Sequence, residues 1–154
     1  MLHLVTAPLK LVDPAPPEIS LRIDRQTLAK RLWRGVAEDG TEFGFELAQP
    51  LRHGAIVFRT AASQYVVRQN PEPVLVVSLA LAPSAAAGIG WAVGNLHLEL
   101  SAEPARLIAP DEPAVRQLLA RLQVPFESTT AVFQPGRFAR GALPSHELGY
   151  SHRH

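Results

Sequence analysis

The histidines are the side chains of this sequence whose type and spacing could bind a metal ion. His97 lies in GIGWAVGNLHLEL, residues 88–100, after a run of glycines and small apolar residues. His146, His152 and His154 fall within nine residues near the end of the chain, a composition that occurs in metal-binding tails. Cysteine is absent, so the available ligands are imidazole with water or carboxylate, a set that suits nickel, zinc and copper. The alternatives are a His97 that only packs and a tail of random polar composition.

The sequence carries no signal of catalysis. It lacks a nucleophile elbow, a P-loop, an HExxH motif and carboxylates at a suggestive spacing. The stretch GIGWAVG differs from the dinucleotide fingerprint in spacing, and its glycines fall inside a predicted helix instead of the turn before it. We therefore predict that the protein is not an enzyme. A small enzyme that uses His97 as acid or base, with Glu99 beside it, is the weaker alternative.

The elements around His97 are predicted from local patterns. Ser84 is expected to cap a helix over residues 85–93, and Gly94 and Asn95 are expected to end it. Residues 96–101, LHLELS, alternate in polarity and predict a strand, with the leucines on one face and His97 on the other, away from the core.

The predicted helix also has a face of small residues. Ala86, Gly90 and Gly94 recur every four positions and share this face. The face could rest on the protein's own sheet or on a second copy of the chain. A twofold axis at a face between two copies would bring two copies of His97 together, which makes one histidine per chain into two ligands per dimer.

Residues 74–133 as a whole predict a β-α-β-β-α-β order, the ferredoxin-like arrangement. VLVVSLA is a short apolar strand, and residues 106–109 are the predicted hairpin partner of residues 96–101. DEPAVRQLLARL is a helix that opens at Asp111, with an apolar stripe, and VPFESTTAVF is the last strand. The stripe consists of Val115, Leu118, Leu119 and Leu122. Residues 134–154 show no clear period and are expected to be a flexible, histidine-containing tail.

Residues 1–70 predict a small all-β domain, so the fold class is α+β. Asp39-Gly40 is a strong hairpin signal, and Phe43, Phe45 and Leu47 alternate with residues that face water. AIVFRT and QYVVRQ are further strands. The segment NPEP, residues 70–73, stops the sheet, because proline cannot donate to a strand ladder. We place the domain boundary there.

Composition excludes several classes of partner. The 154 residues include 15 basic and 14 acidic ones, for a net charge of +1, which argues against a broad nucleic-acid-binding face. Residues 74–93 lack charge, but Pro83 divides them and no basic anchors flank them, so no membrane span is expected. The N-terminal segment does not read as a signal peptide. The absence of cysteine fits the reducing cytoplasm.

The motif WAVGNLHLEL resembles the H-L-G-N-R-H motif of the UreE family, the nickel metallochaperones of urease assembly. The β-rich first half, the proline boundary, the second-half order and the histidine-bearing tail also occur in the family's order. The resemblance implies a cytoplasmic homodimer in which His97 of both subunits binds Ni²⁺. Gly94 and Asn95 match the motif's G-N. His152 and His154 match by region and type only, and would supply further ligands.

Departures from the family motif limit what the resemblance implies. Ala92 stands where the family has its first motif histidine, and Leu96 replaces the arginine. The tail is short, so few metal ions per dimer are expected, with Zn²⁺ or Cu²⁺ able to compete for the site. The implied partners are the GTPase UreG and the urease apoprotein complex, and the first domain would be a peptide- or partner-binding module. The alternative function is a metal-independent dimeric adaptor in which His97 is packed.

Overall fold

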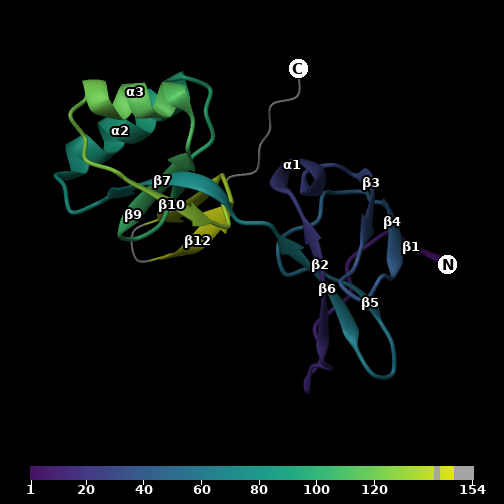
Figure 1. The fold of residues 1–154 in the computed structure, drawn as a ribbon. Helices are drawn as coiled ribbons and strands as arrows, with labels where there is room; N and C mark the ends of the chain where they lie inside the picture. The colour runs from purple at the N-terminus through teal and green to yellow at the C-terminus, as the bar shows by residue number, and fades with distance from the viewer. Residues whose placement is uncertain (141–142, 148–154) are drawn as a thin grey trace. The chain divides into compact units, whose positions relative to one another are not determined.

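The computed structural model describes residues 1–140 and 143–147. The chain is a mixed α+β protein with several sheets and few helices, and it divides into two compact units, Met1–Asn70 and Pro71–His154 (Figure 1). None of the described helices has the length and apolar character that a membrane span requires.

The first unit consists of two three-stranded sheets and one short helix. One sheet has the order β1-β4-β3 and the other the order β2-β6-β5. The elements are β1 Leu2–Val5, β2 Glu18–Ile23, α1 Arg25–Leu28, β3 Leu32–Val36, β4 Glu42–Glu46, β5 Ile56–Arg59 and β6 Gln64–Gln69. The sequence patterns predicted β3 to β6 but not β1 or α1. The signal for α1 is Asp24, whose carboxylate accepts a hydrogen bond of 2.8 Å from the Thr27 backbone N–H and so caps the helix.

The predicted hairpin at Asp39-Gly40 is confirmed, but its turn is not of type I′, the type for which this dipeptide is a strong signal. Strands β3 and β4 pair antiparallel, and Gly40 takes a φ of 87° whereas Asp39 stays outside the left-handed region. A type I′ turn would need positive φ at both residues. The turn is held instead by the Gly40 N–H, which donates to the Ala37 carbonyl, and by the Asp39 carboxylate, which accepts from the Thr41 N–H at 3.0 Å and the Tyr65 hydroxyl at 2.7 Å.

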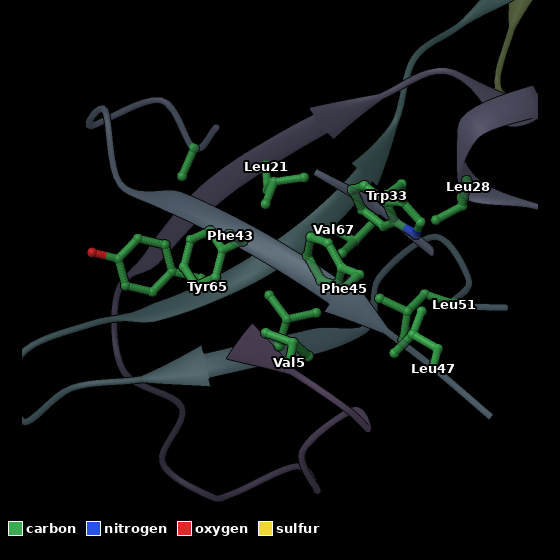
Figure 2. Close-up of a cluster of buried hydrophobic side chains, with 12 residues drawn as sticks. Val5, Leu21, Leu28, Trp33, Phe43, Phe45, Leu47, Leu51, Tyr65 and Val67 are labelled. Carbon is green, nitrogen blue, oxygen red and sulfur yellow. The ribbon is translucent and has the colours of Figure 1, made fainter. Parts of the chain in front are cut away.

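The core of the first unit lies between its sheets and is rich in aromatic side chains (Figure 2). Phe43 and Phe45 are fully buried and Leu47 is 7% exposed, as predicted, but Gly44, which was expected to face water between the two phenylalanines, is also buried. The Trp33 ring stacks on Phe45 with centroids 3.7 Å apart. Offset aromatic contacts of this kind add to the hydrophobic stabilisation of the buried rings.

The second unit has the predicted order of elements. β7 Glu72–Ser78, α2 Pro83–Asn95, β8 Ser101–Ala102, β9 Arg106–Pro110, α3 Pro113–Arg121 and β10 Glu127–Ala131 are followed by β11 Arg137–Arg140 and β12 Leu143–Glu147. The sheet order is β10-β7-β9-β8-β11-β12, and its first four strands are antiparallel neighbours. The prolines of the NPEP segment precede and enter β7, so they mark the start of a strand as well as the boundary.

Helices α2 and α3 pack on one face of this sheet. Ile89 and Val93 of α2 share a core cluster with residues of α3, β7 and β9. Val115, Leu118 and Leu119 of α3 are buried as the stripe predicts, but Leu122 follows the last helical turn and is 44% exposed. Phe133 is fully buried in a separate cluster with Val74 and Ile108.

The predicted start of α3 at Asp111 is wrong by two residues. The helix begins at Pro113 and has Glu112 as its cap residue, without a capping side chain. Asp111 pairs with Arg116, with oxygen–nitrogen distances of 2.5 and 2.7 Å, and this hydrogen-bonded guanidinium lowers the pKa of the Asp111 carboxyl. The last predicted strand, residues 124–133, is shorter in the structure, which has β10 at Glu127–Ala131.

A candidate metal site at the end of helix α2

His97 lies exposed after the end of helix α2, but the bounds of the helix differ from the predicted ones. The helix starts at Pro83, because proline fits the first turn, where no N–H partner is needed; Ser84 is not its cap. It continues through Gly94 and Asn95, the residues expected to end it.

His97 itself takes the left-handed conformation that ends the helix. Its φ is 56°, and its backbone N–H donates to the Gly94 carbonyl at 2.9 Å. A residue with a Cβ is disfavoured in this region by roughly 1 kcal/mol or more, and histidine is among the side chains found there more often. His97 therefore closes the helix at some cost to the backbone.

The predicted strand over residues 96–101 is wrong. Only Ser101 and Ala102 form a strand, because the turn at His97 leads into an irregular segment. Leu98 and Leu100 are half-buried against the core of the second unit, and the Gly136 N–H donates to the Leu100 carbonyl at 2.9 Å. The leucines thus pack inward without a strand, and His97 remains exposed, as the pattern had implied.

The small-residue face of α2 divides between two environments. Ala86 and Gly90 are half-buried, and a Cβ added to Gly90 would lie 3.7 Å from Leu100. Gly94 is exposed, and no atom comes within 4 Å of the place of its missing Cβ; the same is true of Gly88. Trp91, on the same side of the helix as Gly88, is 72% exposed. The exposed side of α2, on which Ser84 and Asn95 also lie, therefore carries no charged residue.

Electrostatics at this end of α2 favour a cation. The C-terminal end of a helix has a partial negative charge from its unpaired carbonyls. No Lys or Arg lies between Pro83 and Leu100, and Glu99 follows His97 by two residues. Within the described residues no three His, Asp or Glu side chains converge as a metal-binding group. One chain therefore contributes a single imidazole here, which by itself is an incomplete coordination shell.

The start of the tail is ordered beside β8. Strand β11 pairs parallel to β8 through Phe138 and Ala102, and β12 folds back on β11, with His146 in register with Phe138. The expectation of a flexible tail from Gln134 is therefore not confirmed, since residues 137–140 and 143–147 form strands. His152 and His154, the predicted tail ligands, lie outside the described residues.

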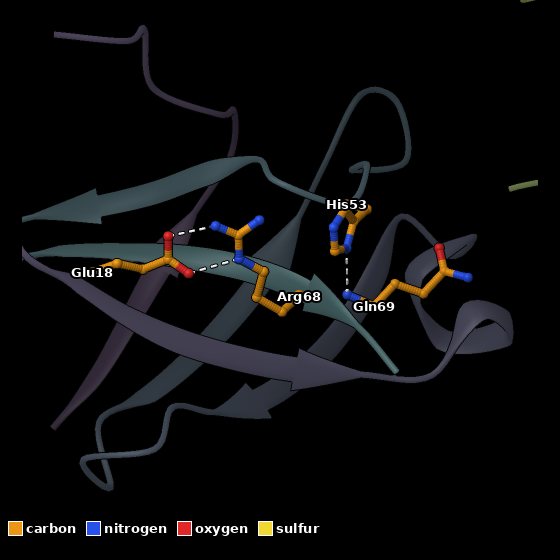
Figure 3. Close-up of polar contacts among 4 residues, drawn as sticks. All are labelled: Glu18, His53, Arg68 and Gln69. Carbon is orange, nitrogen blue, oxygen red and sulfur yellow. Dashed lines mark hydrogen bonds and ion pairs between the residues drawn. The ribbon is translucent and has the colours of Figure 1, made fainter. Parts of the chain in front are cut away.

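The two histidines of the first unit have other roles. The Nδ1 of His53 accepts a hydrogen bond of 3.0 Å from the Gln69 backbone N–H, so the neutral ring carries its proton on Nε2 (Figure 3). Neither nitrogen then offers a free lone pair to a metal. His53 is part-buried. His3 packs on aromatic rings, 4.5 Å from Phe58 and 5.6 Å from Phe43 between centroids, a contact that the sequence did not indicate.

Comparison with known proteins places these features in a family. Residues 72–154 match the model of the UreE urease accessory protein C-terminal domain. The chain is 32% identical over 130 residues to a urease accessory protein UreE of Deinococcus radiodurans, covering 82% of this chain and 81% of that protein. It is 31% identical over 138 residues to UreE of Rhodobacter capsulatus, covering 87% and 85%. UreE of Staphylococcus aureus strain MRSA252 is 29% identical over 106 residues, covering 68% and 70%.

Proposed function

Because this chain belongs to the UreE family of urease accessory proteins, we propose that it is a homodimeric nickel chaperone that binds Ni²⁺ between two copies of His97 and delivers it to the urease apoprotein. An accessory protein of this family serves urease maturation and is not an enzyme. Nickel is then the cargo of the protein.

The observation that carries the proposal is an exposed imidazole next to an open, uncharged helix surface. His97 is exposed at the end of α2, and the adjoining helix surface around Trp91 and Gly94 carries no charged side chain. Gly94 lies three residues before His97 with open space at the place of its missing Cβ, so a second chain can approach the helix closely beside the imidazole. A twofold axis near His97 brings the two rings to one ion, so that each chain needs to supply only one fixed ligand.

The remaining ligands are assigned to His152 and His154. They follow β12 in the chain, and the β11–β12 hairpin joins the sheet at β8, which begins four residues after His97. Two ligands fixed by the fold and others on the tail would allow stepwise ligand exchange with a receiving protein. Imidazole ligands do not separate nickel from zinc or copper by affinity alone, so Zn²⁺ and Cu²⁺ compete.

The two units divide the work in this proposal. Residues 74–133 form the ferredoxin-like metal-binding and dimerisation domain. Residues 1–70 form the partner-binding domain, and residues 134–154 carry the tail ligands. The partners are UreG and the urease apoprotein complex, and the work takes place in the cytoplasm.

Titration calorimetry with Ni²⁺ tests the proposal. The wild type and His97→Asn are compared, because asparagine also tolerates positive φ and so keeps the turn while removing the imidazole. The proposal expects about one strong site per dimer, lost in the variant. His53→Gln is the matched control and should bind as the wild type does. Strong binding that survives His97→Asn moves the site elsewhere, and no strong binding in the wild type favours the metal-independent adaptor.

A further inference from the structure

The β1-β4-β3 sheet of the first unit has a second face, opposite the core. Strand register places eight residues on it, and we call this set the outer face. They are Leu2 and Leu4 of β1, Glu42, Gly44 and Glu46 of β4, and Leu32, Arg34 and Val36 of β3. The residues between them, such as Val5, Trp33, Phe43 and Phe45, point into the core and are buried.

Four of the eight positions are large aliphatic side chains in contact with solvent. Leu2 is 44% exposed, Leu4 66%, Val36 57% and Leu32 74%. The solvated face of an antiparallel or mixed sheet is normally polar, and a contiguous exposed apolar surface marks an interaction site. The same strands bury Val5, Trp33, Phe43 and Phe45 on their other face, so the pattern is not the result of a strand placed in the wrong register.

Gly44 shapes the centre of the outer face. Leu2 lies on one side of it, with Leu2 carbons 3.3 to 3.8 Å from the place of the missing Cβ, and Arg34 is its register partner on the other side. A glycine inside a strand is unfavourable and often marks a close approach by another backbone. Here Gly44 is buried, and the Leu2 side chain occupies the space above it, so an aliphatic side chain of β1 covers the centre of the outer face.

The charges of the outer face indicate which partner fits. Glu42 and Glu46 are exposed on either side of Gly44 along β4, about 13 Å apart for four residues of strand. Two carboxylates against one guanidinium, that of Arg34, give the face a net negative charge, which disfavours anionic lipid and nucleic acid. A second copy packed face to face, centred on Gly44, would set glutamate against glutamate.

We propose that the outer face docks a basic amphipathic helix of a partner protein. Its apolar residues would contact the aliphatic side chains of β1 and β3, with the helix lying along β4 over Gly44. Two Lys or Arg residues seven positions apart, about 10.5 Å along a helix, would reach Glu42 and Glu46. The proposal rests on the partner-binding role given to residues 1–70 above, but not on the nickel site.

Two synthetic peptides test this docking surface with the full chain. One is a helix of about 18 residues with a leucine stripe and lysines seven apart, and the other has glutamates in place of the lysines. Binding is measured by fluorescence anisotropy, and the contact residues are mapped by amide chemical-shift changes. The charge-reversal variant Glu42→Lys/Glu46→Lys is compared with Glu127→Lys, which reverses an exposed strand carboxylate of the second unit.

The wild type should bind the lysine peptide at least tenfold more tightly than the glutamate peptide, with shifts at residues 2–4, 32–36 and 42–46. Glu42→Lys/Glu46→Lys should invert this preference, whereas Glu127→Lys should leave it unchanged. Leu4→Ser/Leu32→Ser should weaken binding of the lysine peptide at least tenfold. His97→Asn should bind the peptide as the wild type does, which separates failure of this proposal from failure of the nickel site. The proposal would be overturned if the wild type bound both peptides equally or bound neither. It would also be overturned by chemical-shift changes confined to other residues, or by self-association of the wild type that Leu4→Ser/Leu32→Ser abolishes.

Discussion

The His97 backbone N–H donates to the Gly94 carbonyl, so the candidate metal ligand is also the residue that ends helix α2. The side chain projects from a left-handed residue, at a φ of 56°, that follows an uncharged helix. The proposed metal binding and the end of the helix therefore depend on the same position, and substitutions there must be chosen to separate the two.

In the metal-free protein, the stability of His97 variants should follow how readily each residue adopts positive φ. The free energy of unfolding of His97→Gly should exceed that of His97→Ala by about 1 kcal/mol, because glycine adopts positive φ without a Cβ penalty. Chemical denaturation in the presence of a chelator measures this difference. Gln123, which has the same φ of 56° after α3, supplies the control pair Gln123→Gly and Gln123→Ala. Equal stability of the two His97 variants would contradict the left-handed conformation.

Trp91 should be required for dimer formation. Trp91→Glu places a charge on the open side of α2, and burying it unpaired in an interface of uncharged residues would be strongly unfavourable. Sedimentation analysis should find the wild type as a dimer and Trp91→Glu as a folded monomer. Leu11→Glu, at an 84% exposed position of the first unit, should stay dimeric. A dimer that survives Trp91→Glu places the interface away from α2.

Removing the tail histidines should weaken nickel binding without changing its stoichiometry. His152→Ala/His154→Ala leaves two His97 ligands per dimer, so affinity should fall at least tenfold while the ratio stays near one ion per dimer. Calorimetry measures both quantities at once, and His146→Ala in β12 is the matched single-histidine control. Unchanged affinity in the double variant would exclude these two side chains as ligands.

Acid should remove the contribution of the Glu18–Arg68 pair to stability. Arg68 donates from Nε at 2.6 Å to one oxygen of Glu18 and contacts the other (Figure 3), and this hydrogen bonding lowers the pKa of Glu18 below its usual 4.5. A carboxyl with a lowered folded-state pKa stabilises the protein above its unfolded-state pKa, and this contribution is lost as pH falls through the folded value. The two side chains are about one-third exposed, so solvent screening limits the effect to about 0.5 kcal/mol.

The comparison of wild type with Glu18→Gln measures this effect. The difference in unfolding free energy should be present at pH 7 and should shrink as the pH falls below 4.5, the usual pKa of glutamate. Glu127→Gln should show no such dependence. If wild type and Glu18→Gln still differed in unfolding free energy in acid, the lower stability of the variant would come from lost packing and not from lost charge.

Patterns with one buried face were predictable from the sequence. Phe43 and Phe45 face the core of the first unit while Glu42 and Glu46 are exposed, and the stripe of α3 holds from Val115 to Leu119. The order of elements in the second unit followed from such patterns and from the positions of the prolines.

The errors lie where distant contacts decide the local structure. Leu98 and Leu100 alternate with polar residues as in a strand, but they pack against a core formed by other elements. The turn that precedes them follows from α2 extending to Asn95, which the sequence pattern did not indicate. Strand β11 has only four residues, Arg137–Arg140, which is too short for a period of two to be recognised. His97 was found as a candidate by its motif, yet no pattern within one chain can reveal a ligand that a second copy supplies.

The most direct test of the central claim is a crystal structure of the nickel-loaded protein with anomalous scattering recorded at the nickel edge. The account predicts one peak on the twofold axis of a dimer, within coordination distance of an imidazole nitrogen from each His97. Two separate peaks on single chains, or a peak away from position 97, would contradict it.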